Sequence, residues 1–97
     1  MYGLIGRIQA MPGKRDVLAE ILIDGVGGMP GCLSYVVARD TEDADSLWVT
    51  EVWDSPASHR ASLSLPSVRE AITAGRPLIV AFHEQRETEP LGGHGLA

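Results

Sequence analysis

Residues 46–64, SLWVTEVWDSPASHRASLS, contain the change of pattern that decides the fold. The first eight residues of this stretch are rich in the β-branched and aromatic side chains that are typical of a strand. Ser55 then stands where a helix N-cap belongs, and Pro56 follows at the first helical position, where its missing N–H costs nothing. The stretch therefore predicts a strand over residues 46–53 that leads directly into a helix over residues 56–64.

The segments that precede this stretch complete the first half of the pattern. Five of the six residues 40–45 are polar, and they predict a hairpin loop between the strand at 46–53 and another at 32–39. Upstream, hydrophobic residues at helical spacing predict a helix over 14–26, which a glycine-rich segment ends. Residues 2–10 read as the first strand because they are apolar and end at a Pro-Gly turn.

The segments that follow it complete the second half. Pro66 interrupts the predicted helix, and a short helix is expected over residues 66–74, with Gly75 in the position of a helix-ending glycine. Residues 78–89 then form the last expected strand. The resulting order, β-α-β-β-α(α)-β, predicts an α+β protein with a ferredoxin-like fold and an antiparallel sheet.

The composition limits the classes of protein to consider. The 97 residues fit a single domain, which we place at residues 1–90, with a glycine-rich tail at 91–97 that is either flexible or in contact with a partner. A net charge of −5 argues against nucleic-acid binding, and the single cysteine, Cys32, forms no intrachain disulfide. Neither a membrane span nor a signal peptide is visible, so we expect a cytoplasmic protein without a membrane partner.

The hydrophobic residues of the predicted strands fall on both faces of the sheet. In the last strand, Leu78, Val80 and Phe82 share one parity, while Ile79 and Ala81 share the other. Helices can cover only one face, and the other would expose a large apolar patch. We therefore expect a homodimer that packs sheet against sheet, the alternative being a monomer with a wet, mildly apolar sheet.

Common catalytic motifs are missing from the sequence. The three histidines, His59, His83 and His94, lie far apart and have no metal-ligand spacing, so no metal site is predicted. Trp53 and His59 stand out because they flank the junction between strand and helix, where an indole and an imidazole can border one cavity. Histidine is suited to proton transfer near neutral pH. The alternative is that Trp53 is a core residue and His59 a surface one.

Several short runs together resemble a known family. They are residues 12–15 (PGKR), 29–32 (MPGC), Tyr35, 51–55 (EVWDS) and His59. In combination these runs are similar to the antibiotic biosynthesis monooxygenase family, most of all to its quinol-monooxygenase-like members. The resemblance implies a ferredoxin-like protomer that pairs into a dimeric α+β barrel. It also implies that no metal, flavin or haem cofactor is used, because the family's substrate, a quinol or anthrone, is deprotonated and passes an electron to O₂ itself.

The resemblance also suggests roles for individual residues. His59 is the candidate for orienting or deprotonating a phenol, Trp53 for lining the pocket, and Tyr35 for donating a hydrogen bond to the substrate. Many members place a histidine three residues further along the same helix, where this chain has Ser62. The chain contains no asparagine, which argues against the haem-degrading branch of the same fold. The full prediction is catalytic His59 and Trp53, with Tyr35, His83, Leu63 and Phe82 binding the substrate.

The predicted function is thus a cofactor-independent monooxygenase acting on a small aromatic quinol- or anthrone-like substrate with O₂. One alternative is a non-catalytic module on the same dimeric scaffold that binds an aromatic ligand or serves a stress response. Another is an isomerase or lyase of the same fold, because a scaffold of this kind hosts many activities.

Overall fold

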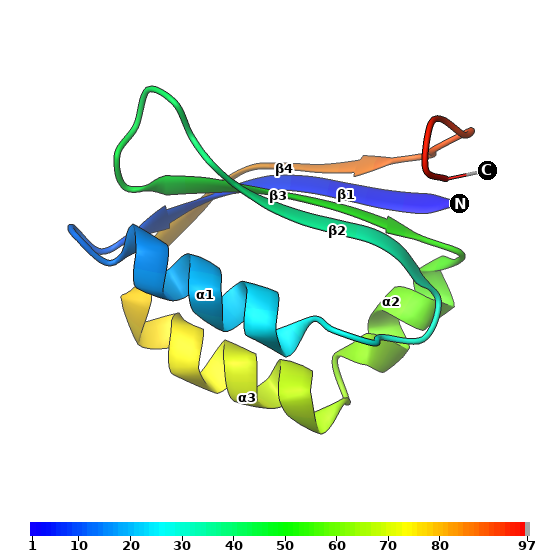
Figure 1. Ribbon diagram of the computed structural model, residues 1–97, viewed down its shortest axis with the longest axis horizontal. Coiled ribbons are helices and arrows are strands. Elements are labelled where there is room, and N and C mark those ends of the chain that lie inside the picture. Colours follow the sequence, from blue (N-terminus) through cyan, green and yellow to red (C-terminus); the bar gives the residue numbers. More distant parts are fainter. Residues whose placement is uncertain (97) are drawn as a thin grey trace.

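The computed structural model describes residues 1–96 and shows a four-stranded sheet with helices on one side (Figure 1). The strand order is β2-β3-β1-β4, and every neighbouring pair is antiparallel. This arrangement confirms the predicted ferredoxin-like α+β fold. The elements are β1 (Tyr2–Ala10), α1 (Arg15–Gly25), β2 (Cys32–Arg39), β3 (Ser46–Trp53), α2 (Pro56–Ser62), α3 (Pro66–Gly75), a 3₁₀ turn η1 (Arg76–Leu78) and β4 (Ile79–Thr88).

The second predicted helix is two residues shorter than expected. The α2 helix ends at Ser62, because the N–H groups of the next three residues bond to carbonyls three positions back and tighten the chain into 3₁₀-like turns. Leu65 is extended, with φ −68° and ψ 135°, as expected for a residue that precedes a proline. Pro66 then starts α3 at its first position, where no N–H is needed.

Gly75 does not end α3 in the way the sequence suggests. Its φ of −80° and ψ of −32° are helical, so the expected left-handed cap is wrong. The glycine instead permits close packing, because a Cβ atom at this position would lie 3.1 Å from Cδ1 of Leu18. The chain continues through η1, and β4 consequently begins at Ile79, one residue later than predicted.

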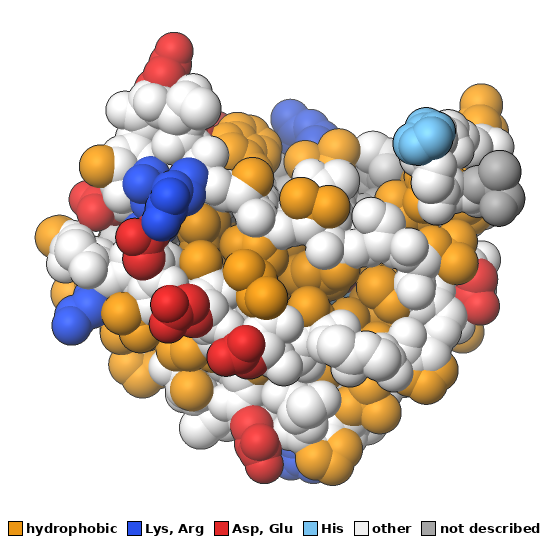
Figure 2. All heavy atoms as spheres, viewed as in Figure 1, with side chains coloured by type: hydrophobic (Ala, Val, Ile, Leu, Met, Phe, Trp, Pro, Cys, Tyr) orange, Lys and Arg blue, Asp and Glu red, His pale blue; other side chains and the backbone are white. Residues whose placement is uncertain are grey.

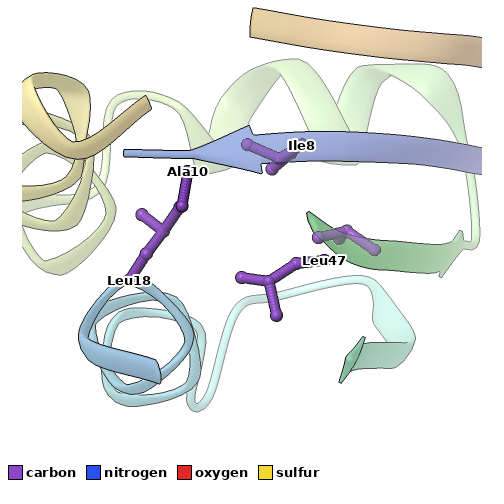
Figure 3. Packing of buried hydrophobic residues seen from close by; sticks show 5 residues of the cluster. Ile8, Ala10, Leu18 and Leu47 are labelled. Carbon is purple, nitrogen blue, oxygen red and sulfur yellow. The ribbon is translucent and has the colours of Figure 1, made fainter. Parts of the chain in front are cut away.

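The largest hydrophobic cluster lies between one face of the sheet and helix α1. Leu18 projects from α1 toward Ala10 at the end of β1, with Ile8 and Leu47 beside it (Figure 3). Leu18, Ala10 and Leu47 are completely buried. We call these residues, together with Val49, the Leu18 cluster. A second cluster, the Trp53 cluster, consists of Met29, Trp53 and Val68.

Strict alternation in the last strand was the wrong expectation. The pairing of β4 with β1 shifts register so that Ala10 faces Ile79 while Ile8 faces Phe82. Ile8 and Ala10 lie on the same face of β1, so the bulge in β4 brings Ile79 and Phe82 to that face as well. Both residues therefore stand on the helix-covered side of the sheet.

The opposite, open face of the sheet is more polar than the sequence suggests. Arg7 forms an ion pair with Glu84, and His83 Nε2 lies 3.0 Å from Oε1 of Gln9. Glu84 has a φ of 36°, which places it in the left-handed region at the second irregularity of β4. Val36 is half-exposed on the edge strand β2. A mixed polar and apolar face leaves the sheet-to-sheet dimer as a prediction.

Hydrophobic and acidic side chains occupy different parts of the surface. In the view of Figure 2, hydrophobic side chains gather in a band between the sheet and the helices, and acidic side chains lie along α1. Within residues 1–96, no helix is both long and apolar enough to cross a membrane. Of the predicted tail at 91–97, residue 97 lies outside the described part of the chain.

Candidate active site

A cavity of about 460 Å³ lies between the helix-covered face of the sheet and helices α1 and α3. This volume falls in the range typical of sites for small organic ligands, roughly 300–1,000 Å³. Most of its lining is hydrophobic and comes from both layers. Among the lining residues are Leu4, Ile8, Leu22, Val49, Ile72 and Phe82, and the polar or charged ones are Tyr35, Glu51, Arg76 and Gln85.

Sheet register places the two most reactive groups of the lining side by side. Tyr35 of β2 pairs directly with Glu51 of β3, and Glu51 in turn pairs with Leu4 of β1. The three residues form one row across the sheet, and all three line the cavity. Directly opposite residues in an antiparallel pair have close side chains, so a phenol and a carboxylate face the same space.

Two aromatic side chains lie next to the Glu51 carboxyl group and outside the cavity lining. Trp53 Nε1 donates a hydrogen bond to Glu51 Oε1 at 3.1 Å, and His59 Nε2 lies 3.9 Å from the same oxygen. The Glu51 side chain is only 16% exposed. Burial raises the pKa of this carboxyl, although the indole hydrogen bond and the nearby His59 partly oppose that effect.

Local structure fixes the position of His59. The Ser55 Oγ accepts a hydrogen bond from the backbone N–H of Ser58 at 3.2 Å, which caps α2 as the sequence predicts. The imidazole ring lies 5.5 Å from the Trp53 ring, edge-on, and 5.8 Å from the Tyr2 ring. The capped helix thus places His59 beside Trp53, with its Nε2 turned toward Glu51.

Tyr35 is the second polar group of the cavity. Burial, reinforced by the nearby Glu51 and Cys32, raises the pKa of its phenol far above the usual range. The side chain therefore stays protonated near neutral pH and can donate a hydrogen bond. No residue in the described part of the chain bonds to its hydroxyl, which is thus free to meet a ligand.

The predicted site residues fall into three groups in the structure. Tyr35 and Phe82 line the cavity, whereas Trp53 and His59 lie behind Glu51 and contact the cavity through it. Leu63 is 48% exposed just beyond α2, and His83 lies on the open face of the sheet. Neither of these two is part of the cavity lining.

Glu51 is the candidate that the sequence reasoning missed. It was recognised only as part of the EVWDS run. Because side chains two positions apart on a strand share a face, the Glu-x-Trp spacing could have placed it beside the buried Trp53. Among residues 1–96, no group of three or more His, Cys, Asp and Glu side chains is arranged to hold a metal ion.

Comparison with known proteins agrees with the fold. A family profile described as antibiotic biosynthesis monooxygenase matches residues 1–74. A crystal structure of a candidate antibiotic biosynthesis monooxygenase from Chloroflexus aurantiacus J-10-fl is 64% identical, with a TM-score of 0.97 over 99% of this chain and 98% of that one. One from Deinococcus radiodurans is 25% identical, with a TM-score of 0.78 over 96% and 95% of the two chains.

More distant relatives share the fold. A candidate monooxygenase from Caulobacter crescentus CB15 is 18% identical, with a TM-score of 0.82 over 93% of this chain and 89% of that one. No functionally curated protein matches the chain. The family match and the similar structures support a general monooxygenase-like role. The profile covers well over half of the sequence, and the chain belongs to the antibiotic biosynthesis monooxygenase family.

Proposed function

We propose that the protein is a cofactor-independent monooxygenase that oxidises a small aromatic quinol- or anthrone-like substrate with O₂. The observation that carries this proposal is the cavity, which is mostly hydrophobic and presents one phenol, Tyr35, beside one carboxylate, Glu51. Apolar walls suit a flat aromatic ring, and a few polar groups suit its hydroxyl or carbonyl oxygens.

The chemistry requires little more than a base and a dry site. Removing a proton from the substrate leaves an electron-rich anion, which passes one electron to O₂ and forms a radical pair with superoxide. Recombination gives a peroxide, and loss of water then turns a ring CH₂ of an anthrone into C=O. One oxygen atom stays in the product and the other leaves as water, so the four electrons lost by carbon match the four gained by O₂. The apolar lining favours this sequence because it keeps water away from the intermediates.

A homodimer is part of this proposal. The open face of the sheet combines half-exposed hydrophobic residues such as Val36 with the polar Arg7, Gln9 and His83. A second copy that packs against this face would cover the hydrophobic residues and would leave the cavity, on the other side of the sheet, accessible in each chain. Analytical ultracentrifugation across a concentration series checks this, and a monomer at every concentration would contradict it.

Oxygen consumption is the direct test of the activity. Metal-stripped protein is mixed with anthrone and with menadiol-type quinols, and O₂ uptake is compared with autoxidation in buffer and with heat-denatured protein. We expect uptake well above both controls, and with ¹⁸O₂ we expect one labelled atom in the anthrone product. Absence of excess uptake across the panel would rule out the proposed activity.

The two alternatives give different results in the same assay. Quenching of tryptophan fluorescence by an aromatic ligand, without turnover, would indicate a binding module. Product formed at equal rate under nitrogen would indicate an isomerase or lyase, since those reactions consume no O₂.

A further inference from the structure

The cavity has only one group that can accept a proton near neutral pH. Among the described residues that line it, three carry titratable side chains: Tyr35, Glu51 and Arg76. An arginine stays protonated in proteins, and the Tyr35 phenol, kept neutral by burial, is a donor. Glu51 is therefore the base that a phenolic substrate meets inside the cavity.

The two oxygens of the Glu51 carboxylate differ in their partners. Its Oε1 faces Trp53 and His59, which lie outside the cavity lining. Its Oε2 receives no hydrogen bond from any residue in the range 1–96, although every fully buried polar side-chain atom in that range has a partner. One oxygen is thus hydrogen-bonded to Trp53, and the other has no partner among these residues and can meet a ligand.

His59 connects this carboxylate with solvent. Its side chain is 23% exposed, whereas Trp53 is almost completely buried. The 3.9 Å between His59 Nε2 and Glu51 Oε1 is longer than a hydrogen bond, and a small rotation of the carboxyl group would close it. Imidazole exchanges protons with water near neutral pH, so a proton on this side of Glu51 has a path through His59 to solvent.

We propose that Glu51 is the catalytic base, taking the phenolic proton of the substrate, and that His59 is a positioning residue that passes this proton to solvent. This inference rests on the proposed monooxygenase function. In a quinol, or in the enol tautomer of an anthrone, the substrate O–H bond breaks and a bond from that hydrogen to Glu51 Oε2 forms, which leaves the electron pair on the substrate oxygen. The carboxyl group then rotates about its soft terminal torsion and delivers the proton to His59 Nε2. The imidazolium releases it to water, so no oxidant or reductant takes part in this step.

The groups around Glu51 determine how the step responds to pH. They are Tyr2 of β1, Cys32 and Tyr35 of β2, His59 of α2 and Arg76 of η1. Burial raises the pKa of the Cys32 thiol, and the pKa values of both phenols also lie above their usual range. Among these groups, protonation of Glu51 is therefore expected to limit the step on the acid side.

Replacement of the carboxylate tests the proposal directly. Glu51→Gln keeps the shape and an oxygen for the Trp53 hydrogen bond but does not accept a proton. We expect kcat to fall about 100- to 10,000-fold while KM changes little. Glu51→Asp keeps a carboxylate and should retain part of the rate. Glu70→Gln, an exposed residue of α3, is the matched control and should behave like the wild type. Circular dichroism confirms that each variant is folded.

The role of His59 has its own signature. In the wild type, kcat/KM should fall on the acid side as Glu51 becomes protonated. Because the positive charge of His59 favours the ionised carboxylate, His59→Gln should move this acid limb to higher pH, and added imidazole should restore part of the rate. If the acid limb did not move, His59 would not be the residue that passes the proton from Glu51 to solvent.

A binding experiment separates failure of this inference from failure of the proposed function. Bound 4-nitrophenol reports its ionisation by its absorbance near 400 nm. In the wild type a neutral phenol should be favoured beside the Glu51 carboxylate, so the bound dye should ionise at higher pH than it does in Glu51→Gln. This result would support the contact even if no substrate consumed O₂. Equal titrations in the two proteins, no binding by either, or a Glu51→Gln enzyme with the wild-type rate would overturn the inference.

Discussion

The Leu18 cluster and the Trp53 cluster occupy the same layer between sheet and helices, yet they differ in their surroundings. Hydrophobic side chains and the phenol of Tyr35 pack against the Leu18 cluster. The Trp53 cluster also packs against Tyr35, but its central indole donates to a carboxylate and stands edge-on to an imidazole. One end of the layer therefore contributes mainly hydrophobic burial, and the other holds titratable groups at a cost in stability.

This difference separates two kinds of variant. Changes at the Leu18 cluster should lower the free energy of unfolding by a similar amount at every pH, because no charge is involved. Changes around Trp53 should have smaller effects on stability and should alter how stability or activity depends on pH.

The largest effect is expected for Leu18→Ala. This side chain is completely buried against Ala10, so its removal leaves a cavity and should reduce the free energy of unfolding by about 3 kcal/mol. Urea denaturation at pH 5 and pH 8 measures the loss, which should be the same at both. Leu91→Ala, at a position that is 90% exposed, is the matched control and should have no measurable effect. If the stability lost in Leu18→Ala depended on pH, the Leu18 cluster would not differ from the Trp53 cluster in this respect.

A close approach of two helices predicts the next effect. A Cβ atom on Gly25 of α1 would lie 2.5 Å from the Cβ of Ala71 on α3, so Gly25→Ala should destabilise the protein by about 2 kcal/mol through overpacking. Gly27→Ala is the control, because a Cβ there meets no atom within 4 Å. Adding Ala71→Gly to Gly25→Ala should recover part of the loss in thermal unfolding. No recovery would show that the loss has another cause.

The helix cap beside His59 predicts a smaller change. Ser55→Ala removes the acceptor for the Ser58 N–H, which should cost about 1 kcal/mol. The comparison is Ser64→Ala, because Ser64 is exposed and its side chain forms no hydrogen bond within the described residues. If Ser55→Ala and Ser64→Ala had the same melting temperature in calorimetry, the cap would not contribute to stability.

Features of the fold that are encoded locally could be predicted from the sequence. The strand-to-helix junction at Ser55 and Pro56 depends on neighbouring residues only, and the structure confirms it. The bulge in β4 depends instead on how that strand pairs with β1, so alternation along 78–82 failed to predict it. The role of Gly75 likewise depends on Leu18, which is distant in the chain.

The candidate site was harder to predict for the same reason. The sequence draws attention to Trp53 and His59 because of their residue types and their place at a junction. Glu51 matters because of what surrounds it, which comes from β2, β3 and α2 at once. A carboxylate on a strand is ordinarily exposed, and only the assembled layers show that this one is buried.

The smallest effect is expected for Glu51→Gln, which tests whether the titratable groups around the Trp53 cluster make stability depend on pH. Burial raises the pKa of Glu51 above its ordinary value of 4.5, so the folded protein holds this proton more tightly than the unfolded chain. Stability therefore falls as the pH rises from about 4.5 through the folded pKa, a cost that Glu51→Gln does not have. Urea denaturation at several pH values should show the variant gaining stability relative to the wild type over this window. Other carboxylates such as Asp16 and Glu84 are common to both proteins and cancel in the difference. Glu70→Gln should give no such trend, and a Glu51→Gln protein that loses stability relative to the wild type as the pH rises would mean that the ionised carboxylate stabilises the fold.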